Sequence, residues 1–448
     1  MNKFLIKQAS IVNEGEVKIA DVLIVDERIK SIATSISANN VNIIDAEGLY
    51  LIPGMIDDQV HFREPGIIHK ADISSESKAA VAGGITSYMD MPNTIPNTLT
   101  QELLENKYTL ASKKSLANYS FFMGVSQHNL EEVLKTDSEN VCGISDDGLY
   151  FNNDEGILAN YPEFLEKLFS KTETLVALHC EDESIIKKNT TKYQSEFGDA
   201  IPFHFHSKIR DEEACLEATK RVLEIANKHN NRLHLLHIST LAEANLLSNK
   251  IPIRKKRITA EACAHHLWFS EKDYNRLGNK IQWNPSIKTE ADKNGLLQSL
   301  LNNKLDIIAT DHAPHLLSEK EGNYFQIKSG APLVQHALPV LLELYHQGKI
   351  SLQQIVEKTS HHVAEIYRIK ERGYIREGYY ADLVLLDINN PWQVTSANLL
   401  YKCKWSPFDN YQFKSKVMQT FVNGHQVYNN EIFNETNKGK RLKFEKIR

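Results

Sequence analysis

The chain has 448 residues, of which 42% are hydrophobic and 24% charged, as in a soluble globular protein of one large domain or two to three ordinary ones. A formal net charge of −5 and a pI near 6.4 give no electrostatic reason to expect nucleic acid or an anionic membrane as a partner. No apolar run approaches the roughly 20 residues of a membrane span, and the N-terminal residues do not have the pattern of a secretory signal, so we expect a cytoplasmic protein.

Five cysteines are scattered along the chain, and none of them forms a CxxC pair. This pattern favours reduced thiols over a disulfide framework or a structural zinc knuckle. It therefore agrees with a cytoplasmic location. The chain also carries 18 histidines, more than usual for its size, so their positions matter.

The two ends of the chain predict short β-strands separated by turns. The β-rich runs are residues 4–9, 20–25, 29–33, 381–387 and 417–428, the last being a hairpin around Asn423-Gly424. Neither end carries enough apolar sequence to form a core of its own. We therefore predict one small β domain built from residues 1–53 and 373–448.

Residues 54–372 repeat a pattern of apolar strand, polar loop and helix. The candidate strands are residues 55–61, 85–91, 118–125, 141–147, 175–180, 233–239, 257–263 and 306–311. The candidate helices are residues 74–82, 100–111, 155–169, 212–228, 241–247 and 291–301. Strands that alternate with helices imply a parallel sheet, and eight such units fit a (β/α)₈ TIM barrel in an α/β protein. An open doubly wound sheet is the structural alternative.

Side chains of the kinds that bind metals follow five of these strands, at the C-terminal ends where barrel enzymes build their sites. These residues are His61, Asp147, His179, His237 and Asp311. Neutral imidazoles and carboxylates that arrive from separate strands suit Zn²⁺, with a position left open for water. Such a metal lowers the pKa of bound water toward about 7. The sequence therefore predicts a divalent metal site at one mouth of the barrel.

Taken singly, these residues also have structural interpretations. A histidine at a strand end is often only hydrogen-bonded, and Asp146-Asp147-Gly148 is a turn signal. The five together, in barrel order, favour the metal site. His265 and His266 follow the seventh predicted strand and are interpreted as residues that line the mouth without joining this set.

The motifs that carry these residues resemble those of the dihydroorotase family, amidohydrolases that interconvert N-carbamoyl-L-aspartate and L-dihydroorotate in pyrimidine synthesis. The matching segments are 60–66 (VHFREPG), 91–94 (MPNT), 145–148 (SDDG), 179–182 (HCED), 237–240 (HIST) and 309–315 (ATDHAPH), with flanks at 52–57 (IPGMID) and 377–383 (EGYYADL). The resemblance spans nearly the whole chain.

The resemblance implies one or two zinc ions per chain. His61 would bind the more exposed α metal, Asp147 would bridge the α and β metals, and His179 and His237 would bind β. Asp311 would bind α and act as general base and acid. The last role agrees with the residue chemistry, because a carboxylate beside a metal can take a proton from water and pass it to the leaving amide nitrogen.

Arg63 is the predicted carboxylate-binding residue, because a guanidinium grips a carboxylate with two parallel hydrogen bonds. It stands two residues after His61, so on a continuous strand it points to the same side. A salt bridge at the rim of the barrel is the alternative. The resemblance further implies that Asn93, Asn284 and His315 contact the carboxylate or ring amide of the substrate.

The chain departs from the family pattern at the first predicted strand, where the usual His-x-His is Gln59-Val60-His61. An amide oxygen can ligate Zn²⁺, but more weakly than an imidazole. Three outcomes are open: a weakened metal pair, a single metal at the β position, or Gln59 placed beside the ligands without binding. Residues 284–288 (NPSIK) and 329–335 (SGAPLVQ) also depart from the family pattern.

These departures leave three functions open. The first is a zinc-dependent dihydroorotase. The second is an inactive homologue that serves as a structural partner of aspartate transcarbamoylase. The third is another cyclic amidohydrolase of the dihydropyrimidinase or allantoinase type, although those resemble enzymes with a carboxylated lysine on strand four, and residues 141–148 contain no lysine. A homodimer is also possible, and the polar segment 314–330 is a candidate lid.

Overall fold

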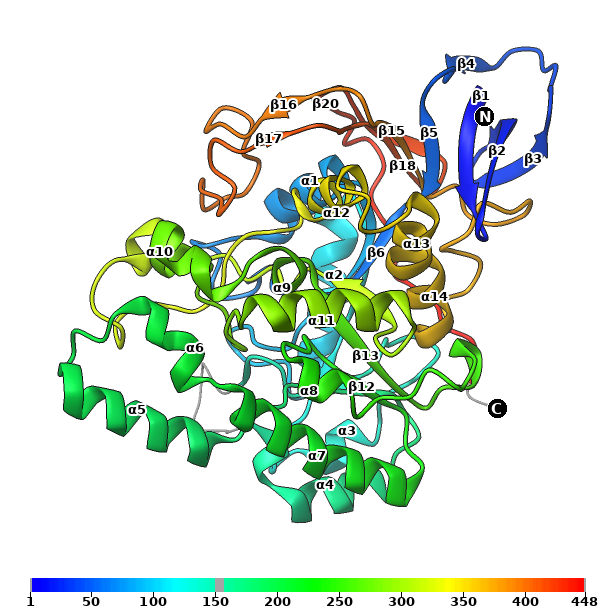
Figure 1. Ribbon diagram of the computed structural model, residues 1–448. Helices are drawn as coiled ribbons and strands as arrows, with labels where there is room; N and C mark the ends of the chain where they lie inside the picture. Colours follow the sequence, from blue (N-terminus) through cyan, green and yellow to red (C-terminus); the bar gives the residue numbers. More distant parts are fainter. Residues whose placement is uncertain (1, 150–156, 447–448) are drawn as a thin grey trace.

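A computed structural model describes residues 2–149 and 157–446 as a (β/α)₈ barrel with a mixed β-sheet at one end (Figure 1). The barrel strands are β6 (Met55–Val60), β7 (Ile85–Asp90), β8 (Asn118–Phe121), β9 (Met123–Gly124), β10 (Ile144–Ser145), β11 (Val176–Leu178), β12 (Leu233–Leu235), β13 (Ile258–Cys263) and β14 (Ile307–Ala309). The (β/α)₈ fold that the sequence predicts is confirmed.

The barrel closes because two parallel sheets meet at both edges. One sheet has the order β6-β7-β8 and the other β14-β13-β12-β11-β10-β9. Strands β8 and β9 are consecutive segments separated by a single residue, so they join the sheets on one side. On the other side Val60 forms a parallel bridge with His312, and the His61 amide donates to the His312 carbonyl at 2.8 Å. A closed barrel has no free edge, which excludes the open doubly wound sheet.

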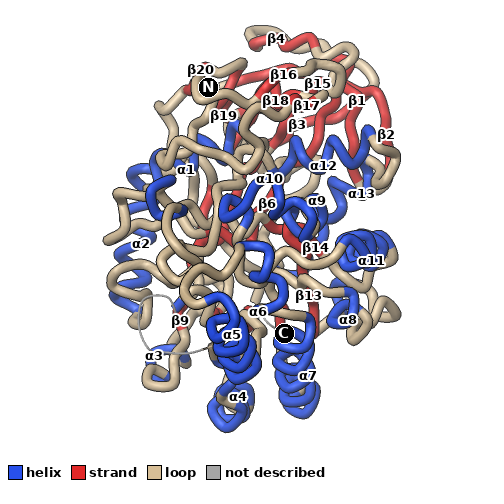
Figure 2. Tube along the Cα trace, turned by 60° about the vertical axis from the view of Figure 1, so that its left-hand side comes forward, coloured by secondary structure: helices blue, strands red, loops and turns tan. Residues whose placement is uncertain are grey.

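Helices surround the strands (Figure 2). They are α1 (Ile73–Ala82), α2 (Gln101–Lys114), α3 (Leu130–Val133), α4 (Pro162–Phe169), α5 (Glu183–Phe197), α6 (His206–Ile209), α7 (Glu212–His229), α8 (Leu241–Ala244), α9 (Ala264–Trp268), α10 (Tyr274–Leu277), α11 (Glu290–Leu301), α12 (Ala337–His346), α13 (Leu352–Val356) and α14 (His362–Tyr367). Side-chain caps fix several starts, as where the Asp211 carboxylate accepts from the Ala214 amide at the start of α7. The helix predicted at 155–169 begins outside the described residues, and its described part is helical only from Pro162, after a 3₁₀ turn at Leu158–Asn160. No helix in the described part of the chain is long and apolar enough to cross a bilayer.

The two ends of the chain share one nine-stranded sheet. Its strands are β1 (Lys3–Asn13), β2 (Glu16–Val25), β3 (Arg28–Ala33), β4 (Asn42–Asp45), β5 (Tyr50–Pro53), β15 (Leu383–Asp387), β18 (Lys416–Val422), β19 (His425–Asn429) and β20 (Ile432–Phe433). Strand β5 runs antiparallel to β15, with Ile52 opposite Val384, so pairing across the chain supplies the core that neither end has alone. A separate pair joins β16 (Trp392–Gln393) to β17 (Gln412–Phe413). The domain boundaries at 53/54 and 372/373 stay a prediction.

Strand β6 is buried along its whole length although it contains the polar run Asp57-Asp58-Gln59. Buried polar groups need hydrogen-bond partners. Asp57 accepts from the Thr310 hydroxyl at 2.6 Å, and Asp58 accepts from the Tyr367 hydroxyl at 2.8 Å. These bonds tie β6 to its neighbours and fix the strand that carries Gln59 and His61 to the mouth.

Candidate metal centre

The carboxylate of Asp147 lies at the centre of the predicted site, two residues after the end of β10. Its Oδ1 lies 3.6 Å from His179 Nδ1 and 3.7 Å from His237 Nε2. Its Oδ2 lies 3.3 Å from His61 Nε2, which is also 3.2 Å from Asp311 Oδ1. Residues that follow the barrel strands β6, β10, β11, β12 and β14 therefore meet at one point.

These side chains form two possible metal-ligand sets that share Asp147. One set is Asp147, His179 and His237, and the other is His61, Asp147 and Asp311, with ligand atoms within 4.8 Å of one another in each set. Two ligands of one tetrahedral zinc lie about 3.4 Å apart, as follows from bond lengths of about 2.0–2.2 Å. The distances from Asp147 match this spacing, and each set keeps positions open for water or substrate. The donors of each set therefore suit a divalent ion, and Asp147 belongs to both sets.

Hydrogen bonds at the outer ring nitrogens give His61 and His179 the orientation of metal ligands. His179 Nε2 lies 2.8 Å from Glu181 Oε2, which also pairs with Arg210. His61 Nδ1 lies 2.8 Å from Asn93 Oδ1. If these nitrogens carry the proton, the inner nitrogens present lone pairs to the site, as metal-binding histidines commonly do. Glu181 and Arg210 are not among the site residues that the sequence predicts, although Glu181 stands two residues after His179.

Three site residues have a left-handed backbone. The φ angles are 64° at Arg63, 36° at His237 and 46° at Asp311. This region is unfavourable for residues other than glycine and persists where the surroundings enforce it, often at functional sites. The indole Nε1 of Trp283 donates to the Asp311 carbonyl at 3.3 Å and helps to hold that turn.

The carboxylates and imidazoles of the centre stabilise one another's charged forms. Burial opposes ionisation of Asp147, but hydrogen bonds from His179, His237 and His61 hold the pKa of its carboxyl well below its ordinary value. Burial lowers the pKa of His61 and His179, but the carboxylates beside them (Asp147 and Asp311 for His61, Asp147 and Glu181 for His179) outweigh burial and raise each pKa to about 9. A cation at this point, whether a proton or a metal, is therefore favoured.

Gln59 contacts the centre but presents its amide nitrogen to it. Its Nε2 donates to Asp147 Oδ2 at 3.0 Å, and its Oε1 faces Cys263 Sγ at 3.7 Å. In this orientation the side chain holds the carboxylate and turns its oxygen away from Asp147. Gln59 as a metal ligand stays a prediction, and the placement favours the outcome in which it lies beside the ligands.

Arg63 reaches the site, but for a different reason than the sequence predicts. Strand β6 ends at Val60, so the alternation of a continuous strand does not orient Arg63, and its left-handed backbone does. Its Nε donates to the Pro314 carbonyl at 3.2 Å, and its Nη2 lies 3.2 Å from His315 Nε2. Among residues 2–149 and 157–446 it has no ion pair with a carboxylate. Arg63 is thus a buried cation without a directly paired carboxylate, and the nearby charges, that of Asp311 foremost, act on it from beyond ion-pair distance.

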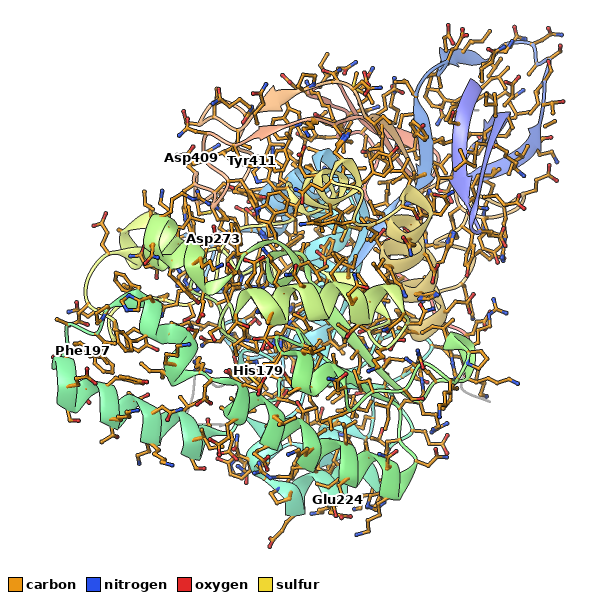
Figure 3. The ribbon with its side chains drawn as sticks, in the orientation of Figure 1. His179, Phe197, Glu224, Asp273, Asp409 and Tyr411 are labelled. Carbon is orange, nitrogen blue, oxygen red and sulfur yellow. The ribbon has the colours of Figure 1, made fainter. Side chains whose placement is uncertain are left out.

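A small cavity of about 20 Å³ separates Arg63 from the metal-ligand sets. Its lining is His61, Arg63, Asn93, Asp147, Trp283, Asn284, Asp311, Ala313, Ser329 and Gly330. Such a volume holds about one water molecule, so a ring-shaped substrate needs the lining to move. Ser329 and Gly330 end the predicted lid at 314–330. Figure 3 shows His179 in the interior of the molecule, away from Glu224 on the outer helix α7.

Asn284 also lines the cavity, and its Oδ1 is buried without a hydrogen-bond partner among the described residues. His315 lies behind Arg63, 3.1 Å from Lys70 Nζ. Lys70 in turn pairs with Glu319 at 2.7 Å. Lys70 and Glu319 were not predicted, because nothing in their local sequence distinguishes them from surface charges.

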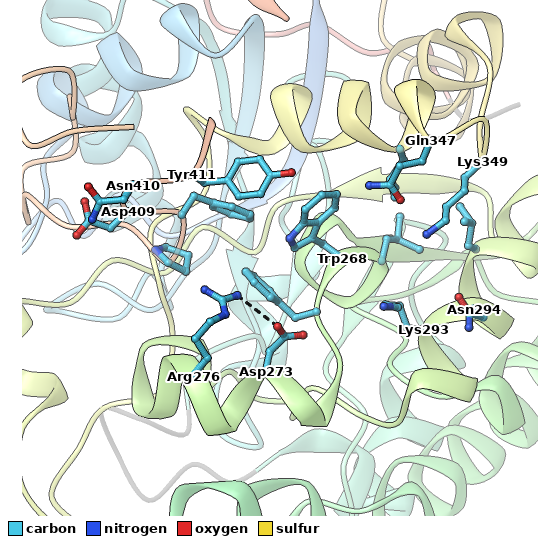
Figure 4. Close-up of a pocket in the computed structure, with 16 residues that line it drawn as sticks. Trp268, Asp273, Arg276, Lys293, Asn294, Gln347, Lys349, Asp409, Asn410 and Tyr411 are labelled. Atoms are coloured by element: carbon cyan, nitrogen blue, oxygen red, sulfur yellow. Dashed lines mark hydrogen bonds and ion pairs between the residues drawn. The ribbon is translucent and has the colours of Figure 1, made fainter. Parts of the chain in front are cut away.

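A second pocket of about 440 Å³ lies between α11, α12 and the loop at 407–411 (Figure 4). Trp268 and Tyr411 line it, together with the ion pair between Asp273 and Arg276. In the described part of the chain its lining contains none of the possible metal-ligand sets. The predicted chemistry therefore belongs to the smaller cavity.

Comparison with known proteins decides the family. The sequence model described as the amidohydrolase family matches residues 50–427. The chain belongs to the amidohydrolase family. This confirms the predicted resemblance at the level of the family, and the protein is accordingly a hydrolase.

Several relatives in this amidohydrolase family are similar over almost their full length. A dihydroorotase of Methanosphaera stadtmanae is 30% identical over 97% of this chain and 98% of its own. A dihydroorotase of Ehrlichia canis is 32% identical over 86% and 84%. An allantoinase of Desulfitobacterium hafniense is 30% identical over 95% of each chain. The similarity thus extends to more than one cyclic amide hydrolase.

Solved structures agree on the fold. The L-hydantoinase of Arthrobacter aurescens has a TM-score of 0.90 and 22% identity, covering 99% of this chain and 100% of its own. The dihydropyrimidinase of Brevibacillus agri has a TM-score of 0.86 and 24% identity over the same shares. At this identity the likeness shows the amidohydrolase fold and does not decide the substrate.

Proposed function

We propose that this amidohydrolase is a zinc-dependent dihydroorotase, which interconverts N-carbamoyl-L-aspartate and L-dihydroorotate. The observation that carries the proposal is Arg63, a buried cation without a carboxylate partner beside two metal-ligand sets. Both compounds carry a carboxylate that a guanidinium can bind through two hydrogen bonds. Dihydroorotase relatives at 30% and 32% identity support the same reaction.

In the proposed centre, His179, His237 and Asp147 would hold one ion, and His61, Asp147 and Asp311 the other. Bound zinc ions would acidify water and polarise the ring carbonyl. Asp311 takes the proton of the attacking water. As the carbon–nitrogen bond of the ring breaks, Asp311 passes that proton to the departing nitrogen. The carbonyl carbon becomes a carboxylic acid, which ionises and releases the second proton of the water to solvent. The reverse direction uses the same steps for cyclisation.

The other contacts orient the substrate. Arg63 binds the carboxylate, and His315 lies against its guanidinium at 3.2 Å. Asn284, with its unpartnered buried Oδ1, offers an acceptor for a ring N–H. Asn93 is already bonded to His61, so it orients that histidine as well as facing the cavity. The cavity has room for about one water molecule, so bulk water is excluded.

The allantoinase relative makes the hydrolysis of another cyclic amide a second candidate reaction. Allantoin, hydantoin and dihydrouracil lack a ring carboxylate, and none of them would neutralise Arg63. Five metal-binding side chains form two sets that share Asp147, with ligand atoms within 4.8 Å of one another in each set. This arrangement argues against an inactive partner of aspartate transcarbamoylase. Binding to that enzyme, or pairing into a homodimer, stays a prediction.

The test is a metal-replete assay of purified protein in both directions, with allantoin and dihydrouracil as comparison substrates. Turnover of dihydroorotate above that of both comparison substrates is expected. Turnover of only a carboxylate-free ring would assign another cyclic amidohydrolase, and no turnover of any compound would favour the inactive homologue. We also infer a cytoplasmic location, since all five cysteines are free and buried.

A further inference from the structure

A cysteine and two histidines gather beside the proposed centre without contributing to it. Cys263 ends β13, and His265 and His266 lie in the first turn of α9. Their ligand atoms lie within 4.8 Å of one another. All three are buried, with exposed fractions of 0%, 0% and 2%. Thiolate and imidazole are the ligands that Zn²⁺ prefers in closed protein sites.

The histidines of this cluster are unusual because each keeps a buried ring nitrogen without a partner. The Nδ1 of His266 has no hydrogen bond to the described residues, and the His265 ring faces only the backbone of Thr310, which leaves one of its two nitrogens free. Nearly all buried polar side-chain atoms in native proteins have a partner. The ring of His265 stacks on Trp283 with centroids 4.2 Å apart and planes 5° apart, which covers one face of the ring but not its nitrogens. Two unpartnered nitrogens beside a buried thiol point to a missing ligand.

The second nitrogen of His266 shows how this residue would bind a metal. Its Nε2 lies 3.2 Å from the Pro285 carbonyl, an acceptor that fixes the proton on that nitrogen. The lone pair therefore sits on the unpartnered Nδ1. A histidine that donates to a backbone carbonyl through one nitrogen and binds a metal through the other is the common arrangement in metal sites.

Gln59 completes the set of donors. Its Oε1 lies 3.7 Å from Cys263 Sγ, and its Nε2 is held by Asp147. Two ligands of one tetrahedral zinc that includes a thiolate lie about 3.5 Å apart, so the distance from this oxygen to the sulfur matches that of two ligands of one ion. The ligand atoms of Cys263, His265 and His266 lie within 4.8 Å of one another. Gln59 stands where the family pattern has a histidine. It therefore takes an imidazole away from the α site and offers its amide oxygen to the adjacent Cys263 cluster.

We propose that Cys263, His265, His266 and the Gln59 amide oxygen form an additional zinc site, separate from the pair bridged by Asp147. Binding converts the Cys263 thiol to a thiolate and releases its proton to solvent, with no change in oxidation state. The ion fixes the end of β13 and the His265–Trp283 stack, and Trp283 holds the Asp311 turn. The site is therefore structural and stands beside the catalytic cavity.

Sulfur distinguishes this site from the proposed catalytic pair, whose ligands are nitrogen and oxygen only. Purified protein is loaded with Co²⁺ in place of Zn²⁺, and its near-ultraviolet spectrum is recorded. A sulfur-to-cobalt charge-transfer band is expected, and zinc-loaded protein should show a zinc–sulfur distance of about 2.3 Å by X-ray absorption. Absence of both signals in the unmodified protein overturns the proposal, whatever the catalytic activity.

Variants show which cysteine supplies the sulfur ligand. Cys263→Ser should lose the charge-transfer band and one metal ion per chain, and His266→Gln should weaken metal retention. Cys180→Ser is the matched control, because Cys180 is also buried and adjoins the proposed ligand His179; it should keep the band. A band that persists in Cys263→Ser, or disappears in Cys180→Ser alone, refutes the assignment. The X-ray absorption of the unmodified protein decides the case if a variant fails to fold.

Discussion

The role of Arg63 can be tested by removing the guanidinium and the substrate carboxylate in turn. Arg63 is 7% exposed, and burial lowers the pKa of its guanidinium to about 10, although nearby carboxylates such as Asp311 oppose that shift. An anion that pairs directly with the guanidinium is therefore favoured. A hydrogen bond to a charged group contributes about 1.5–3 kcal/mol. Two such bonds lost in Arg63→Met predict a loss of about 3–6 kcal/mol in transition-state binding.

At about 1.4 kcal/mol per tenfold change, that loss lowers kcat/KM for dihydroorotate by about 10² to 10⁴. Arg63→Lys keeps the charge and one hydrogen bond, so it should lose about 1.5–3 kcal/mol, or about 10- to 100-fold. The assay measures kcat/KM for dihydroorotate and the competitive inhibition constant of dihydrouracil, which has the same ring without the carboxylate. Inhibition by dihydrouracil should not change in either variant.

Arg221→Met is the control, because Arg221 pairs with Asp182 outside the cavity. It should leave both measurements unchanged. An equal loss for dihydroorotate and dihydrouracil in Arg63→Met would mean that Arg63 supports the structure of the cavity and does not bind the carboxylate. The assignment of dihydroorotate as the substrate would then lose the observation on which it mainly rests.

Three further outcomes are expected. Asp311→Asn, which keeps the size of the side chain, should lower kcat by about 10²–10⁴ while the melting temperature changes little; substantial remaining activity would show that another group transfers the proton. Gln59→His should increase the zinc retained after dialysis against a weak chelator, measured as ions per chain, and equal retention in both proteins would mean that Gln59 does not limit the α site. Burial lowers the pKa of His234, but Asp58 and Glu261 outweigh burial and raise the pKa from 6.5 to about 9. The stabilisation that protonated His234 gives to the fold is therefore complete below pH 6.5 and is lost as pH rises through about 9. His234→Gln should therefore cost about 3–5 kcal/mol of unfolding free energy at pH 6 and less at pH 9.5, and a cost independent of pH would refute the charged pair.

The sequence alone was sufficient for the barrel and for the five residues at its mouth. Eight apolar runs alternate with helices, and the position of each His or Asp directly after a run places it at the same end of a parallel barrel. His61, Asp147 and Asp311 can therefore be grouped before any distance is known. The pairing of the two chain ends was also predictable, because neither has enough apolar sequence for a core of its own.

Only the tertiary structure decided how side chains separated by many residues face one another. It turned the amide of Gln59 so that its nitrogen meets Asp147 and its oxygen meets Cys263. It also set the left-handed backbone of Arg63 and left its guanidinium without a direct ion pair among the described residues. Strand periodicity specifies which side of a sheet a residue occupies, whereas rotamers, turns and unpaired groups depend on contacts from other strands. Those contacts arise only when the barrel closes.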